Sequence, residues 1–129
     1  MFDTSALVAI VNGEPEAERF HALLLGHEPV ISCGTLIDTL RVMQVALGPP
    51  ALAAIDRLLE LYRVEPVPVD AGQVALAREG MLACGKGGGE EPAALNFGDL
   101  FAYALARQLG LPLLFKGEDF RATDVTPAS

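Results

Sequence analysis

Apolar and polar positions follow two patterns along this chain, namely short apolar bursts and longer stretches with helical spacing. Helices repeat apolar residues every three or four positions, whereas buried strands are short apolar runs bounded by turn residues. The pattern predicts helices at residues 6–11, 14–25, 34–47, 51–62, 70–84 and 96–110. It predicts short strands just before Asp3 and at residues 29–31, 65–69 and 111–115. Strands that alternate with helices indicate an α/β domain with a parallel sheet.

Length and composition narrow the class of protein. The 129 residues fit one domain, which we expect to span residues 1–129. With 51% apolar and 20% charged residues, the chain has the composition of a folded protein. No apolar run reaches the roughly 18 residues of a membrane span, and the N-terminus lacks the basic flank of a signal peptide. We therefore expect no membrane association and a cytoplasmic location.

The charge balance is strongly acidic. Seventeen acidic residues against nine basic ones give a net charge of −8. This balance disfavours a protein that coats nucleic acid with a broad basic surface. It still allows an enzyme that meets phosphate through a bound metal ion, so the question is which carboxylates cluster.

Most acids have an ordinary explanation. In one predicted helix, Ile55 and Tyr62 belong to the apolar stripe, whereas Asp56 lies on the solvated face. Asp70 precedes another helix as an N-cap, and Gln73 would complete a capping box with it. These positions require no function.

Asp38 is different because it lies in an apolar setting. It shares a helical stripe with Thr35, Val42 and Val45, beside a second stripe that is entirely apolar. A buried carboxylate needs a partner, which could be an arginine elsewhere in the chain or a cation. The sequence leaves both possibilities open.

Three further acids fall where functional groups gather in α/β folds. Asp99 lies in the first turn of the helix that begins at Asn96, where it could complete a capping box or project into the interior. Asp3 and Asp119 each follow a predicted strand, and ligands of open α/β sheets bind beyond the carboxyl ends of strands. Carboxylates that meet at such an edge repel one another, and a hard cation such as Mg²⁺ or Mn²⁺ relieves that repulsion. This reasoning favours a metal site and leaves the reaction open.

Four segments resemble one known family. They are Asp3-Thr4-Ser5-Ala6, residues 32–38 with Asp38, residues 92–99 ending in Asn96-Phe97-Gly98-Asp99, and residues 114–120 with Asp119. Together they closely resemble the PIN-domain ribonucleases, in particular the VapC toxins of toxin–antitoxin pairs. The resemblance covers nearly the whole chain in order, including Thr123-Asp124 near its end.

The resemblance implies a three-layer α/β/α fold with a central, mostly parallel sheet of four or five strands. It also implies an Mg²⁺- or Mn²⁺-dependent endoribonuclease that cleaves RNA, forms a homodimer and is held inactive by a VapB-type antitoxin. Carried over by position, the implied metal ligands and catalytic residues are Asp3, Asp38, Asp99 and Asp119. Residues that would orient ligands or waters are Thr4, Ser5 and Asp124.

The chain departs from the family pattern in two places. Asp38 occupies the position of a glutamate and is one methylene shorter, so a bridging water could be needed between Asp38 and the metal. Residues 87–91, Gly-Gly-Gly-Glu-Glu, replace a stretch that often carries arginine or histidine in similar proteins. Both departures raise the alternative of a PIN-like module that binds RNA or a partner without cleaving.

Two other classes of protein compete less well. Residues 80–86 read G-x-x-x-x-G-K, but Gly87 stands where a P-loop needs serine or threonine, and the motif ends a helix instead of following a strand. A receiver-type phospho-acceptor domain would explain the acidic edge and Lys116, yet its acceptor aspartate is missing, because the strand at residues 29–31 is followed by Ser32.

Overall fold

In the part of the chain that the structure describes, a short parallel sheet lies among six helices. The computed structural model describes residues 1–85 and 95–129, with side chains described up to residue 82 and again from residue 95. Strands β1 (Val30–Ser32) and β2 (Glu65–Val67) pair in parallel, with Val30 opposite Glu65. The helices are α1 (Thr4–Val11), α2 (Ala17–Leu24), α3 (Cys33–Leu47), α4 (Pro50–Leu61), α5 (Ala71–Gly85) and α6 (Phe97–Leu109). The predicted α/β class is confirmed.

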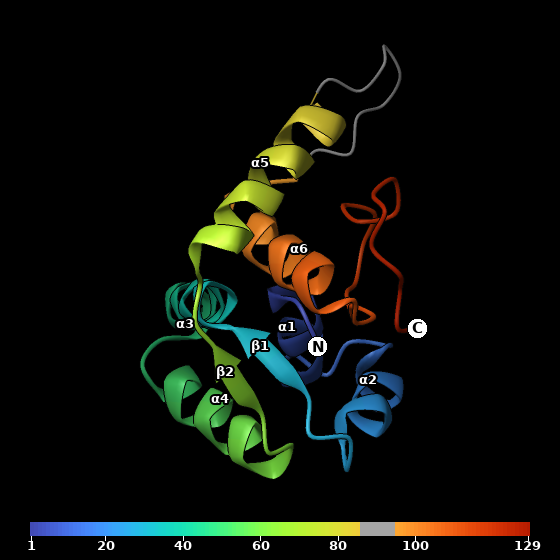
Figure 1. Ribbon diagram of the computed structural model, residues 1–129. Coiled ribbons are helices and arrows are strands. Elements are labelled where there is room, and N and C mark those ends of the chain that lie inside the picture. The colour runs from blue at the N-terminus through green and yellow to red at the C-terminus, as the bar shows by residue number, and fades with distance from the viewer. Residues whose placement is uncertain (86–94) are drawn as a thin grey trace.

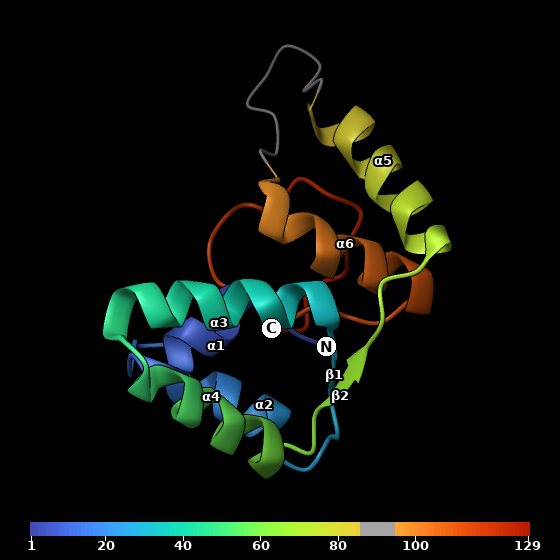
Figure 2. The ribbon, with the colours of Figure 1, turned by 90° about the vertical axis from the view of Figure 1, so that its left-hand side faces the viewer.

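The elements form successive levels, which Figures 1 and 2 show from two sides. Helices α5 and α6 pack together at one end, α1, α3 and the strands lie in the middle, and α2 and α4 lie at the other end. Helix α3 contacts α1, α4 and α6, so it connects these levels. None of the helices in the described ranges is long and apolar enough to span a membrane.

Within the described residues, the sheet is limited to two strands. The segments around Phe2 and Leu114 lie parallel but form one isolated bridge, and Leu113 forms another with Pro127. Among the described residues only β1 and β2 are strands, so the count of four or five strands stays a prediction. The bridge still matters for the site, because the backbone N–H of Asp3 donates to the carbonyl oxygen of Leu114 at 2.9 Å.

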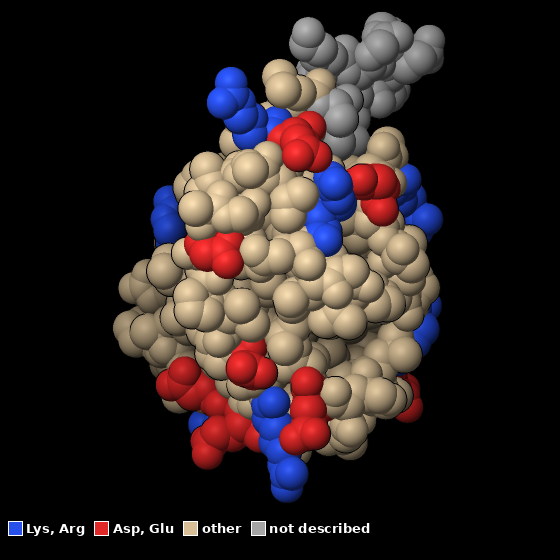
Figure 3. Space-filling model, in the orientation of Figure 1, with Lys and Arg blue, Asp and Glu red and all other residues tan. Residues whose placement is uncertain are grey.

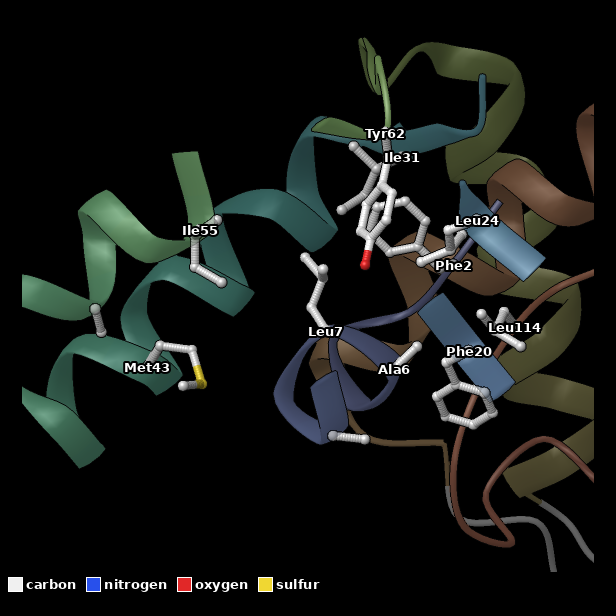
Figure 4. Packing of buried hydrophobic residues seen from close by; sticks show 12 residues of the cluster. Phe2, Ala6, Leu7, Phe20, Leu24, Ile31, Met43, Ile55, Tyr62 and Leu114 are labelled. Atoms are coloured by element: carbon white, nitrogen blue, oxygen red, sulfur yellow. The ribbon is translucent and has the colours of Figure 1, made fainter. Parts of the chain in front are cut away.

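Two apolar clusters hold these elements together. Figure 4 shows the larger cluster, in which Leu7 of α1, Ile31 of β1 and Ile55 of α4 are fully buried. The smaller cluster joins α6 to the C-terminal segment and contains Ala102, Tyr103, Ala106, Leu113, Phe120 and Val125. One buried phenylalanine is adjacent to each of Asp3 and Asp119, namely Phe2 and Phe120, and anchors the ends of the chain that carry these acids.

Helix α4 behaves as its pattern predicts. Ile55 and Tyr62 are buried at 0% and 1% exposure, whereas Asp56 and Arg57 are exposed. The α3 prediction is partly wrong: Met43 is buried, but Val45 is 73% exposed. The stripe assigned to Asp38 therefore reaches the surface at its C-terminal end.

Candidate active site

Four of the predicted acids line one cavity. Asp3, Asp38, Asp99 and Asp119 border a space of about 470 Å³. Ligand pockets in proteins commonly have roughly 300–1,000 Å³. The other residues that line the cavity are Thr4, Ser5, Val8, Arg41, Val42, Asn96, Phe97, Gly98, Lys116 and Phe120. Segments distant in the sequence thus bring their carboxylates to a common space.

Asp3 caps the first helix. Its backbone is extended, and its Oδ2 accepts hydrogen bonds from the Ser5 backbone N–H at 3.1 Å and the Ser5 hydroxyl at 2.8 Å. Oδ1 is buried without a hydrogen-bond partner among the described residues. Burial raises the pKa of Asp3 above its ordinary value, although the Ser5 hydrogen bonds oppose this and nearby Asp38 adds to it. A carboxylate with one fixed and one unpartnered oxygen is suited to bind a cation.

Asp99 opens α6 in a reciprocal capping box. Asp99 N–H donates to Asn96 Oδ1 at 2.9 Å, and Asn96 N–H donates to Asp99 Oδ2 at 3.0 Å. The side chain is nevertheless buried, with 6% exposure, so both possibilities raised by the sequence hold at once. Burial, together with the neighbouring carboxyls of Asp119 and Asp3, raises the pKa of Asp99 to about 7.

Asp38 is held by a chain of hydroxyl groups. Thr4 Oγ1 donates to Asp38 Oδ2 at 2.9 Å, and Thr39 Oγ1 donates to Thr4 Oγ1 at 2.9 Å. No ion pair involves Asp38 within the described ranges, so the possible arginine partner is not found there. Gly98 lies against this carboxylate, since a Cβ at position 98 would lie 2.5 Å from Asp38 Oδ2.

Asp119 enters the cavity from the C-terminal segment and is exposed. The segment is fixed by Lys116, whose backbone N–H donates to the Ser5 hydroxyl oxygen at 3.0 Å. The ammonium of Lys116 contacts Glu14 and lies 3.1 Å from Glu16. Lys116 thus joins the C-terminal segment to the residues that precede α2.

Asp124 lies elsewhere. Its carboxylate is 3.3 Å from the guanidinium of Arg107, and both residues line a separate cavity. The expectation that Asp124 supports the acid cluster is not met in this arrangement, because Arg107 of α6 binds it. Thr4 and Ser5, by contrast, contact the carboxylates that they were expected to orient.

Asp70 has only part of its expected role. It caps α5 by accepting from Gln73 N–H at 2.9 Å. The Gln73 side chain donates to the Pro68 carbonyl and to Gln108 instead of returning to Asp70, so the capping box is not reciprocal. Asp70 does not line the acidic cavity.

The donor set suits a hard divalent cation. Mg²⁺ and Mn²⁺ prefer carboxylate oxygens, and Asp3 offers an unpartnered one. In the side-chain positions seen here, however, no three histidine, cysteine or acidic residues in the described part of the chain converge on a common point. Asp38 accepts a hydrogen bond from Thr4, and Asp119 lies at the exposed side of the cavity beside Asp99.

Several contributors to this cavity were missed by the sequence reasoning. Thr39 is wholly buried at the start of the hydroxyl chain, and a threonine amid apolar helix positions was the available signal. Arg41 follows Asp38 by three positions, so both share a helix face and line the cavity. The departure noted at residues 87–91 lies outside the described residues.

These features define an α/β domain with a carboxylate-lined cavity between its N-terminus, α3, α6 and C-terminal segment. Comparison with known proteins gives the family: a PIN domain model matches residues 1–125. Ribonuclease VapC30 of Mycobacterium tuberculosis is 42% identical over 126 residues, covering 97% of this chain and 95% of its own length. Ribonuclease VapC of Mycolicibacterium smegmatis is 43% identical over 127 residues, covering 97% of this chain and 96% of its own length. The chain belongs to the PIN-domain family.

A solved structure supports the fold. The crystal structure of VapC20 from Mycobacterium tuberculosis, described as a toxin that cleaves the sarcin–ricin loop, aligns with a TM-score of 0.75. The alignment covers 97% of this chain and 95% of that one, at 21% identity. At this identity the likeness supports the architecture, and the functional argument depends on the site and on the closer relatives.

Proposed function

We propose that this protein is a divalent-metal-dependent endoribonuclease and the toxin of a toxin–antitoxin pair. The observation that carries the proposal is the gathering of Asp3, Asp38, Asp99 and Asp119 around one cavity. Relatives of nearly the same length are named ribonucleases, which adds independent support. RNA is the proposed substrate.

Each acid has a proposed role. Asp3 and Asp99 would hold Mg²⁺ or Mn²⁺, with Asp38 and Asp119 completing the site directly or through water. When bound, the cation would lower the pKa of a water molecule and neutralise charge on the phosphodiester. Ser5 keeps Asp3 Oδ2 in place, and the Thr39–Thr4 hydroxyls fix Asp38 Oδ2. These hydrogen bonds hold the carboxylates in place against their mutual repulsion.

An exposed apolar groove supports the proposed partners. It lies between α5 and α6, where Val74 and Met81 are 62% and 52% exposed. Figure 3 shows one face of the molecule, on which the charged groups are separated by a broad uncharged area. Large apolar patches on soluble domains mark protein interfaces. We propose that the chain forms a homodimer and that a VapB-type antitoxin inhibits it.

The test is cleavage of single-stranded RNA by purified protein freed of any antitoxin. Cleavage should require Mg²⁺ or Mn²⁺, stop with EDTA and leave 5′-phosphate and 3′-hydroxyl ends, because water attacks phosphorus and the 3′ oxygen leaves with a proton. Cleavage that survives chelation, or that yields 2′,3′-cyclic phosphate, contradicts the mechanism. The same assay with single-stranded DNA determines whether the activity is confined to RNA.

The four carboxylates line one cavity, but no three of them converge on a common point in the described residues. This second observation favours one alternative, a PIN-like module that binds RNA or a partner without cleaving. RNA binding that persists without any metal-dependent cleavage would support this second function. Cleavage by the wild type that Asp99→Asn abolishes would exclude it.

A further inference from the structure

The acidic cavity carries two cationic side chains, Lys116 and Arg41, among the residues that line it. A polyanionic substrate needs positive groups near four carboxylates, in addition to any metal ion. Lys116 is already engaged, since its ammonium contacts Glu14 and Glu16. Arg41 is exposed and forms no ion pair with the described residues. It is therefore the cation available to a phosphate at this cavity.

Arg41 is placed beside the reacting centre by its helix. It follows Asp38 by three positions on α3, and residues at this spacing have Cβ atoms about 5–6 Å apart. A guanidinium binds phosphate oxygens through two parallel N–H bonds. Arg41 can thus reach a phosphate next to the one that the carboxylates and their metal would hold.

The opposite rim of the cavity carries an unusual aromatic residue. Phe97 is 77% exposed, more than any other large apolar side chain of the described residues. Its ring contacts that of Phe101 edge-on, with centroids 5.1 Å apart and planes at 76°, so it is oriented although its surface faces solvent. Its neighbour Gly98 lies against Asp38. Phe97 and Arg41 therefore flank the same carboxylate.

We propose that Phe97 and Arg41 together bind a single-stranded RNA, with a base stacked on the Phe97 ring and an adjacent phosphate on the Arg41 guanidinium. The inference rests on the proposed ribonuclease function and adds to it the residues that position the strand. Proteins that bind single-stranded nucleic acid combine exposed aromatic rings with cationic contacts to the backbone. The pair requires unpaired bases, so single strands are preferred to duplexes.

A second copy of this chain is the competing occupant of Phe97, because the ring also lines the apolar groove. The position of Phe97 favours RNA as the occupant. Among the exposed residues of the groove, Phe97 alone also lines the acidic cavity, beside Asp38 and Arg41. An apolar contact between copies would bring two such acidic cavities toward each other.

Tryptophan fluorescence tests the stacking directly, since the chain contains no tryptophan. In Phe97→Trp, a short single-stranded RNA added with Ca²⁺ should quench the indole emission in a saturable manner, whereas an RNA duplex should not. No change with RNA overturns the proposal. An emission shift that follows protein concentration instead also overturns it and assigns Phe97 to an interface between copies.

Affinity measurements separate stacking from simple apolar contact. Phe97→Ala should weaken binding of single-stranded RNA roughly 5- to 150-fold, the range expected for loss of one base stack. Phe97→Leu keeps apolar volume but no aromatic face, so it should lose about as much as alanine, while Phe97→Tyr should bind like wild type. If Phe97→Leu binds single-stranded RNA as tightly as the wild type does, stacking on the ring is contradicted.

A matched pair of charge variants tests the second contact. Arg41→Gln should weaken RNA binding several-fold and reduce the salt-dependence slope by about 0.7. Arg57→Gln, on an exposed position of α4 outside the cavity, removes the same charge and should change neither quantity. Equal effects of the two substitutions contradict a local contact of Arg41.

Cleavage by the wild type, measured in the same experiments, distinguishes failure of this inference from failure of the proposed ribonuclease function. If the wild type cleaves RNA but the Phe97 and Arg41 variants bind RNA normally, only this further inference falls. If the wild type neither binds nor cleaves RNA, the proposed function falls with it.

Discussion

Asp99 and Asp70 show how two aspartates at helix N-termini acquire different properties. Both accept a hydrogen bond from a backbone N–H in the first turn of a helix. Asp99 is buried beside other carboxylates, whereas Asp70 is exposed beside Gln108. We expect Asp99→Asn to abolish metal binding and RNA cleavage, because asparagine keeps the capping acceptor but loses the charge.

Asp70→Asn is the matched control for that substitution and should leave metal binding and cleavage intact. Calorimetric titration with Mn²⁺ and a cleavage assay measure both properties. A bound metal adds ~2.7 kcal/mol of stability at about a hundred times its dissociation constant, and Asp99→Asn should lose this increment. Equal losses of metal binding and cleavage in the two variants would contradict the assignment of Asp99 to the site and of Asp70 to helix capping alone.

The raised pKa of Asp99 predicts a pH dependence of the metal-free protein. Its ordinary value is 3.8 and its folded value is about 7, so the folded state binds this proton more tightly than the unfolded state. The resulting stability is complete below about pH 4 and is lost as the pH rises through about 7. In EDTA, the wild-type Tm should therefore fall relative to that of Asp99→Asn between pH 4 and 7. A constant difference in Tm across this range contradicts the raised pKa.

Asp38 tests the departure from the family pattern. Asp38→Glu adds the missing methylene and should bring the carboxylate further into the cavity, tightening metal binding several-fold. The alternative outcome is overpacking against Gly98 and Thr4, which typically costs 1–3 kcal/mol. Calorimetry of metal binding and thermal melts of both metal-free proteins distinguish these outcomes. If Asp38→Glu changed neither the metal affinity nor the thermal stability, Asp38 would not belong to the metal site.

At the scale of elements, the contact between α3 and α6 depends on two glycines with different neighbours. A Cβ at Gly98 would meet the end of the Asp38 side chain, which can rotate away, whereas a Cβ at Gly34 would overlap the ring of Phe101. Gly98→Ala should therefore weaken metal binding with little loss of stability. Gly34→Ala should cost about 1–3 kcal/mol of unfolding free energy and leave metal affinity nearly unchanged. The reverse pattern in melts and titrations would contradict the placement of Asp38.

Helices were predicted well because their patterns are local and long. The stripe of α4 and the inward face of α6, with Ala102 and Ala106, follow directly from residue spacing. Strands were harder to predict: β1 and β2 have three residues each, and the segments at Phe2 and Leu114 form single bridges. The partners of such short segments are distant in the sequence, so local pattern cannot determine their pairing.

The sequence predicted which acids line the candidate site, but not the contacts that surround them. Asp3, Asp38, Asp99 and Asp119 could be selected because of their positions relative to predicted elements and the family resemblance. The engagement of Asp124 by Arg107 and of Lys116 by Glu14 joins residues distant in the sequence, and no local pattern reports such pairs. The burial that raises the pKa of Asp99 is likewise a property of the packed fold.

At the scale of the whole molecule, a net charge of −8 accompanies a largely apolar groove between α5 and α6, whose one charged lining residue among those described is Arg78. Charge repulsion disfavours self-association in general, so a contact between copies should use the part of the surface that lacks charge. The single domain proposed for residues 1–129 buries its cores without covering Val74 and Met81. Their apolar surface is available to a partner.

We therefore expect a homodimer at micromolar concentration that depends on the α5 side of this groove, with Val74 and Met81, and leaves Phe97 of α6 to RNA. Val74→Asp should shift sedimentation toward the monomer, because a charge placed in an apolar contact must be desolvated. Val45→Asp is the control, since Val45 is 73% exposed on α3 and does not line the groove. Both variants should retain the wild-type thermal stability of the monomer because neither side chain is buried. A wild-type monomer at this concentration would contradict the dimer. Dissociation by the Val45 variant alone would move the interface to α3.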